Sequence, residues 1–140
     1  MSYLLDTCVV SEPTKPRPSP DVIDWLRNED PESCYLSVLT LGELEKGIER
    51  LASGARKRAL RRWLETVRAE AADRVIAVDD AIATEWGRAL ARAEKQGQAL
   101  PVIDALLGAT AIVRGLTVVT RNGSDIARTG AAILDPWGPE

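Results

Sequence analysis

The chain has 140 residues, of which 45% are hydrophobic and 28% charged, and its formal net charge is −3. This composition is that of one globular domain over residues 1–140 and argues against disorder. No apolar run approaches the roughly 20 residues of a membrane span, and no secretory signal is visible at the start, so we expect a cytoplasmic protein without membrane contact.

Strands alternate with helices in the predicted pattern. In chain order the elements are a strand over 3–5, a proline-rich connector over 11–20, a helix from Pro20, a strand over 34–38, a helix from about 41 to Gly54, a helix over 55–71, a strand over 74–78, a helix from Asp79 or Asp80 to about Gly97, a helix from Pro101 to Gly115, a strand over 116–120 and a short strand over 131–134. This alternation predicts an α/β three-layer sandwich, with a mainly parallel sheet of four or five strands flanked by helices.

The residues available for chemistry are restricted. The chain contains no histidine, so it lacks the commonest general base and metal ligand, and catalysis would rest on carboxylates. Its two cysteines, Cys8 and Cys34, are too few for a disulfide framework or a structural zinc site. We expect both cysteines as small buried side chains.

Four acidic residues are expected at one edge of the predicted sheet. Asp6 ends the first strand, Glu43 and Asp104 lie in the first turns of two helices, and Asp125 follows the fourth strand. The carboxyl ends of parallel strands meet at one edge, where such folds bind ligands. Like charges gathered there favour a divalent cation such as Mg²⁺ or Mn²⁺, which can promote phosphodiester hydrolysis without histidine.

Three of these acids also have structural interpretations. Glu43 could close a capping box with Thr40, unless Ser37 is the helix cap. Asp104 could favour the positive end of its helix, and Asp125 could be a turn residue. The first acid, at the end of a buried strand, gains nothing from packing and has the weakest structural explanation.

A basic stretch contains Arg56, Lys57, Arg58, Arg61 and Arg62. It is either a solvated helix face or a strip that contacts phosphates. Aromatic residues make up 4% of the chain and phenylalanine is absent, which disfavours a module that stacks RNA bases.

Several segments together resemble a known family. They are YLLDT, VVSEP, LSVLTLGELEKGI, VIDALLGATA, LTVVTRNGSDI and LDPW, and they cover nearly the whole chain. The pattern resembles PIN-domain ribonucleases, in particular the VapC-type toxins of bacterial toxin–antitoxin pairs. The resemblance implies a PIN-like α/β sandwich, RNA cleavage that depends on Mg²⁺ or Mn²⁺, a homodimer, and inhibition by a cognate antitoxin.

The resemblance also implies roles residue by residue. Asp6 and Asp104 would be the main metal ligands, Glu43 would ligate the metal or position a water, and Asp125 would bind a second metal or orient the attacking water. The basic stretch becomes a candidate contact for RNA or antitoxin. The polar residues implied beside the catalytic acids are Thr7, Asn122 and Thr120.

Two departures from the family pattern lie near these acids. Cys8 stands where asparagine or serine is common, which weakens a hydrogen bond near the metal, and Ile126 replaces a phenylalanine. One alternative is a catalytically weak protein-binding module whose acidic pocket docks a basic partner segment. A phosphoacceptor domain is another, but the acid pair at the first strand is missing and Arg121 stands where a lysine is expected.

Overall fold

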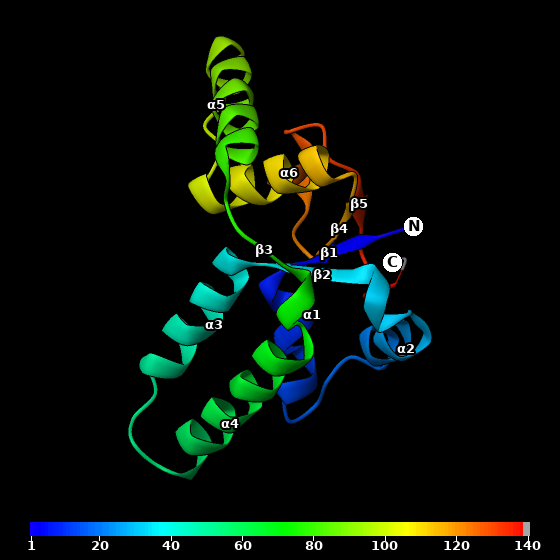
Figure 1. Ribbon diagram of the computed structural model, residues 1–140, viewed down its shortest axis with the longest axis vertical. Helices are drawn as coiled ribbons and strands as arrows, with labels where there is room; N and C mark the ends of the chain where they lie inside the picture. The colour runs from blue at the N-terminus through cyan, green and yellow to red at the C-terminus, as the bar shows by residue number, and fades with distance from the viewer. Residues whose placement is uncertain (139–140) are drawn as a thin grey trace.

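The computed structural model describes residues 1–138 and contains one sheet with helices on both faces (Figure 1). The strands are β1 (Tyr3–Leu5), β2 (Cys34–Ser37), β3 (Val75–Ile76), β4 (Thr117–Val119) and β5 (Ile133–Leu134). The helices are α1 (Thr7–Ser11), α2 (Pro20–Asn28), α3 (Val38–Glu49), α4 (Ala55–Glu70), α5 (Asp80–Lys95), α6 (Val102–Arg114) and α7 (Ser124–Ala127), with 3-10 turns η1 (Glu12–Thr14), η2 (Pro31–Ser33) and η3 (Ala72–Arg74).

The sheet is parallel throughout, in the order β3-β2-β1-β4-β5. Leu4 on the central strand β1 pairs with Tyr35 of β2 on one side and with Val118 of β4 on the other. The chain moves outward from β1 to β3, then crosses back to β4 on the opposite side of β1. This reversal creates a crevice outside the carboxyl ends of β1 and β4, the position where open α/β sheets bind ligands.

Successive side chains of β1 enter different cores, as the two-residue period of a strand requires. Leu5 packs among α1 to α4, whereas Leu4 packs against α5, α6 and α7 on the other face (Figure 1). The predicted three-layer sandwich with a mainly parallel sheet is therefore confirmed. Within residues 1–138, no helix combines the length and the apolar character needed to cross a membrane.

Local start and stop signals account for most helix boundaries. The Ser19 hydroxyl accepts a hydrogen bond from the backbone N–H of Val22, and the carboxylate of Asp79 accepts one from that of Ile82. Gly115, at φ 67°, ends α6 in the left-handed conformation. Sequence patterns did not indicate α1 or α7, because helices of one turn are too short to show a period.

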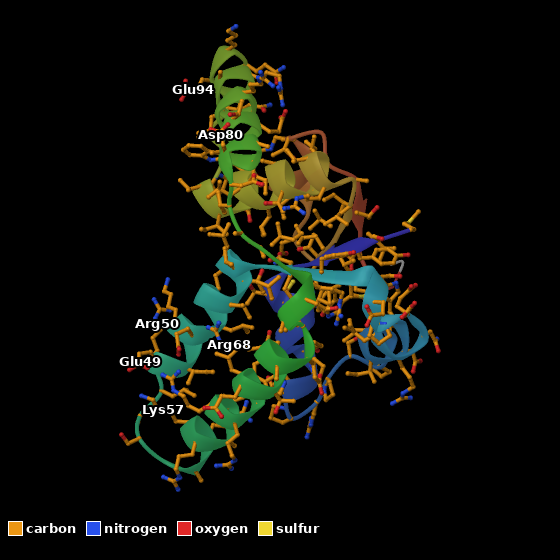
Figure 2. All side chains as sticks on the ribbon, in the orientation of Figure 1. Glu49, Arg50, Lys57, Arg68, Asp80 and Glu94 are labelled. Atoms are coloured by element: carbon orange, nitrogen blue, oxygen red, sulfur yellow. The ribbon has the colours of Figure 1, made fainter. Side chains whose placement is uncertain are left out.

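The third helix ends earlier than its apolar pattern predicts. Its last residue is Glu49, not a residue next to Gly54. The Lys57 ammonium donates to the backbone carbonyls of Glu49 and Leu51, so these terminal acceptors are satisfied without another helical turn (Figure 2). The connection between α3 and α4, residues 50–54, is thus held by a side chain of the following helix.

Packing between α6 and the segment after α7 provides a stability test. A Cβ on Gly108 would lie 2.7 Å from Cγ2 and 2.8 Å from Cβ of Thr129, a buried residue whose hydroxyl donates to the carbonyl of Ile126. Gly108→Ala should therefore destabilise the fold by about 1–3 kcal/mol in urea unfolding. Gly87→Ala, on an exposed position of α5 with open space, should stabilise it by about 0.5–1 kcal/mol. Equal effects would contradict the close approach.

Candidate active site

A polar cavity of about 460 Å³ opens at the carboxyl edge of the sheet, where the β1–β4 crevice lies. All four predicted acids line it, together with the predicted Thr7 and Asn122. The predicted Thr120 lies fully buried beside Asp6. The complete lining is Asp6, Thr7, Cys8, Ser11, Glu43, Asp104, Asn122, Ser124 and Asp125.

Asp6 has two hydrogen-bond donors and a structural role. Its Oδ1 accepts from the backbone N–H of Thr7 at 2.8 Å, which caps the start of α1. Its Oδ2 accepts from the Thr120 hydroxyl at 2.8 Å, across the crevice from β4. The expectation that this acid has the weakest structural explanation of the four is therefore wrong, because it caps a helix that was not apparent in the sequence.

Cys8 lies beside the same carboxylate but holds it only weakly. Its Sγ is 3.9 Å from Oδ2 of Asp6 and 3.8 Å from the hydroxyl of Thr120. The Thr120 hydroxyl makes the shorter bond to the same oxygen of Asp6, at 2.8 Å. Burial raises the pKa of the Cys8 thiol and raises that of Cys34 to about 11, so both partly buried thiols are protonated at neutral pH.

The second family departure, Ile126, has a packing explanation. Its side chain is fully buried in the core cluster that contains Leu107 and Val118. An aliphatic side chain at this position therefore anchors α7 to the sheet and to α6.

Glu43 is free of the capping box that the sequence allowed. The hydroxyl of Ser37, not of Thr40, caps α3, accepting from the backbone N–H of Leu39 at 3.1 Å. Glu43 is exposed at the cavity, and its Oε1 accepts from the Thr7 hydroxyl at 2.6 Å. Thr7 therefore orients Glu43 with its side chain while its backbone N–H holds the neighbouring aspartate.

Asp104 stands in the first turn of α6, as predicted, and its charge is poorly compensated. Partial burial, followed by the charges of Asp6 and Glu43, raises the pKa of its carboxyl. In the described part of the chain, no side chain forms an ion pair or a hydrogen bond with Asp104. These three acids therefore repel one another, and Asp104 keeps both oxygens available for a cation.

Asp125 lies in α7, not in an open turn. Its carboxylate forms an ion pair with Arg128, three residues further along the chain. The preceding turn is fixed to β4 because the backbone N–H of Asn122 donates to the hydroxyl of Thr120 at 3.3 Å. The fourth acid thus reaches the cavity from a well-anchored segment but is engaged by its own arginine.

The donor set fits a hard divalent cation, since carboxylate oxygens are the ligands that Mg²⁺ and Mn²⁺ prefer. Over residues 1–138, however, no three metal-binding side chains are gathered closely enough to hold an ion. Asp6, Glu43 and Asp125 each point an oxygen at a protein donor instead. A cation would compete with these contacts and draw the carboxylates together.

Two hydroxyl residues of the cavity, Ser11 and Ser124, were missed by sequence reasoning. Thr7 and Ser11 are four residues apart in α1 and so share one face of that helix. The four-residue spacing is visible in the sequence, but it indicates a shared face only once α1 is known to be a helix.

The basic stretch does not form one strip. Arg61 pairs with Glu45 and Glu49 of α3, which ties the two helices together. Arg58 and Arg62 are exposed, and neither has an ion pair in the region that the structure covers.

Arg56 contacts a segment outside α3 and α4. Its guanidinium donates to the carbonyl of Thr14 at 3.2 Å, which joins α4 to η1. The exposed Arg58 and Arg62 fit either a solvated face or a phosphate contact, and a binding role for the stretch stays a prediction.

Comparisons with known proteins give the family. A model of the PIN domain matches residues 3–132. The toxin FitB of Neisseria gonorrhoeae is 33% identical to this chain over 135 residues, with 96% of this chain and 97% of FitB covered. The VapC ribonuclease Y4jK of Sinorhizobium fredii is 32% identical over 137 residues, with 97% and 98% covered.

The fold agrees with these sequence matches. A chain in the structure of FitAB bound to the IR36 DNA fragment superposes with a TM-score of 0.93 at 31% identity, with 99% of this chain and 97% of that chain covered. Since sequence and structure agree over nearly the full length, the chain belongs to the PIN domain family, among the FitB- and VapC-type toxins.

Proposed function

We propose that this protein is an endoribonuclease toxin that hydrolyses RNA phosphodiester bonds with the help of Mg²⁺ or Mn²⁺. The observation that carries this proposal is the gathering of Asp6, Glu43 and Asp104 around one polar cavity, in which Asp104 has no protein partner among the described residues. The absence of histidine is consistent with it, and one relative at 32% identity is named a ribonuclease.

Asp6, Glu43 and Asp104 would hold the cation, with Asp125 as a fourth carboxylate. A divalent ion bound there would supply charge neutralisation at phosphate and activation of water near neutral pH. Hydrogen bonds from Thr120 and Thr7 hold Asp6 and Glu43 at the cavity, and a bound cation would draw these carboxylates away from the hydroxyls and towards itself.

Other polar groups of the cavity would contact the substrate. The hydroxyls of Ser11 and Ser124 and the amide of Asn122 line the same cavity and can donate to phosphate oxygens. They would place the backbone of the RNA over the acidic residues.

A cognate antitoxin and a second copy of the chain complete the proposal. This chain superposes over nearly its full length on a chain in the FitAB structure, which supports a protein partner for this toxin. The exposed Val38 and Val102, at the first positions of α3 and α6, offer apolar surface for the homodimer.

Asp104→Asn tests the catalytic proposal. We expect at least about a hundredfold loss of RNA cleavage in Mg²⁺ or Mn²⁺, because a metal ion contributes several kcal/mol to such reactions. This residue is a cleaner choice than Asp6, whose replacement would also remove the cap of α1. Cleavage of a structured RNA is followed on gels. The control is Asp24→Asn, at an exposed position of α2.

Equal cleavage by wild type and Asp104→Asn, or none by either, would contradict the proposal. Calorimetry then identifies the alternative: if a basic partner segment binds while Mn²⁺ does not, the cavity is a docking site without chemistry. Metal binding should also raise the melting temperature, since a ligand of the folded state stabilises it.

The same substitution should increase stability in metal-free solution. In the folded state the pKa of the Asp104 carboxyl is raised above 3.8, its ordinary value in the unfolded chain. The free energy of unfolding therefore decreases as the pH rises from 3.8 towards the raised pKa of the folded state. Asp104→Asn should therefore melt at a higher temperature than wild type at neutral pH. The difference should vanish at about pH 3, where the carboxyl is protonated in both states.

Asp125→Asn is the matched control for these melting experiments, because it removes an acid of the same cavity that is already paired. It should not raise the melting temperature. If both variants gain equally, or neither does, the repulsion at Asp104 is not the cause.

Arg58 and Arg62 are tested as RNA contacts by replacing both with glutamine. Binding is measured by fluorescence anisotropy in the Asp104→Asn background, so that the RNA remains intact. The slope of log K against log salt should fall by about 0.7 for each phosphate that the variant no longer neutralises. The control replaces Arg27 and Arg88 on other helices, and an unchanged slope in the Arg58 and Arg62 variant would assign these residues to a solvated face.

A further inference from the structure

The four acids of the cavity are divided by their partners. Asp6, Glu43 and Asp104 interact electrostatically with one another, and Asp6 and Glu43 accept hydrogen bonds from neutral groups. Asp125 is instead paired with Arg128, a permanent cation. A carboxylate paired in this way is already neutralised before any metal arrives.

The ion pair is built into a short and well-fixed segment. Both partners belong to the single turn formed by α7 and its C-cap, so they lie on the same side of it. Ile126 between them is fully buried, and a Cβ on Gly123 would lie 2.5 Å from Cγ2 of Ile133. The turn therefore packs tightly against β5, which fixes the backbone that carries the two charged side chains.

The strength of the ion pair between Asp125 and Arg128 limits how far it can oppose metal binding. The side chains of Asp125 and Arg128 are 31% and 38% exposed, so water and salt partly screen the pair. Partly exposed pairs of this kind contribute at most about 1 kcal/mol. Such a contact cannot exclude a metal ion from Asp125, but it can compete with one.

We propose that Arg128 competes with the metal ion for Asp125. A single divalent cation is then held by Asp6, Glu43 and Asp104, and Asp125 becomes a ligand when its ion pair opens. The inference rests on the proposed metal site and adds a regulatory residue to it: the Arg128 guanidinium neutralises Asp125 as long as the ion pair is closed.

A double-mutant cycle tests this competition. Binding of Mn²⁺ alone is measured by calorimetry for wild type, Arg128→Gln, Asp125→Asn and the double variant. We expect Arg128→Gln to tighten Mn²⁺ binding by about three- to fivefold, the range that corresponds to releasing a partly exposed ion pair. Asp125→Asn alone should change the affinity by less than about twofold.

The double variant separates a released ligand from a general charge effect. If Asp125 is the group that Arg128 restrains, Arg128→Gln should produce little gain once Asp125 is asparagine. Arg27→Gln, which removes an arginine from a more exposed pair of the same spacing with Asp24 on α2, should leave the affinity unchanged.

Three results would overturn the inference. Equal gains from Arg128→Gln in both backgrounds would show that the arginine acts only through its long-range charge. A loss of Mn²⁺ affinity well above twofold in Asp125→Asn would show that Asp125 is already a ligand. If no variant binds Mn²⁺, the metal site itself is wrong and the inference fails with it, whereas binding without coupling refutes the inference alone.

Discussion

A carboxylate at the end of a buried strand needs hydrogen-bond donors, because a desolvated charge without partners is costly. In this protein the donors for Asp6 come from both sides of the crevice, the Thr7 backbone at the start of α1 and the Thr120 hydroxyl directly after β4. These bonds tie the end of β1 to the residue that follows β4. The shape of the acidic cavity follows from them, since Thr7 also holds Glu43 in place.

The strands, the five longer helices and the gathering of four acids at one edge of the sheet could be predicted from the sequence. Apolar periods and caps such as Ser19 and Gly115 determine most helix boundaries locally, and the parallel order of strands then brings their carboxyl ends together. The one-turn helices α1 and α7 could not be predicted, because a single turn shows no period. Their absence from the prediction concealed the capping role of Asp6 and the pairing of Asp125.

The basic stretch shows a second limit of sequence reasoning. The five positive residues of this stretch lie in the first turns of α4 and have similar chemistry, yet the structure gives them different roles. Arg61 reaches glutamates of the preceding helix and Arg56 reaches a carbonyl more than forty positions away. Such roles depend on which elements become neighbours in the fold, and local spacing does not contain that information.

The bond between Asp6 and Thr120 joins residues 114 positions apart, so it closes a loop that contains most of the protein. Contacts of such long range form late, because the entropy of closing the loop has to be overcome first. During translation, β1 leaves the ribosome long before β4 exists to pair with it. A nascent chain consequently lacks an assembled cavity, and the proposed nuclease can act on RNA only after its synthesis is nearly complete.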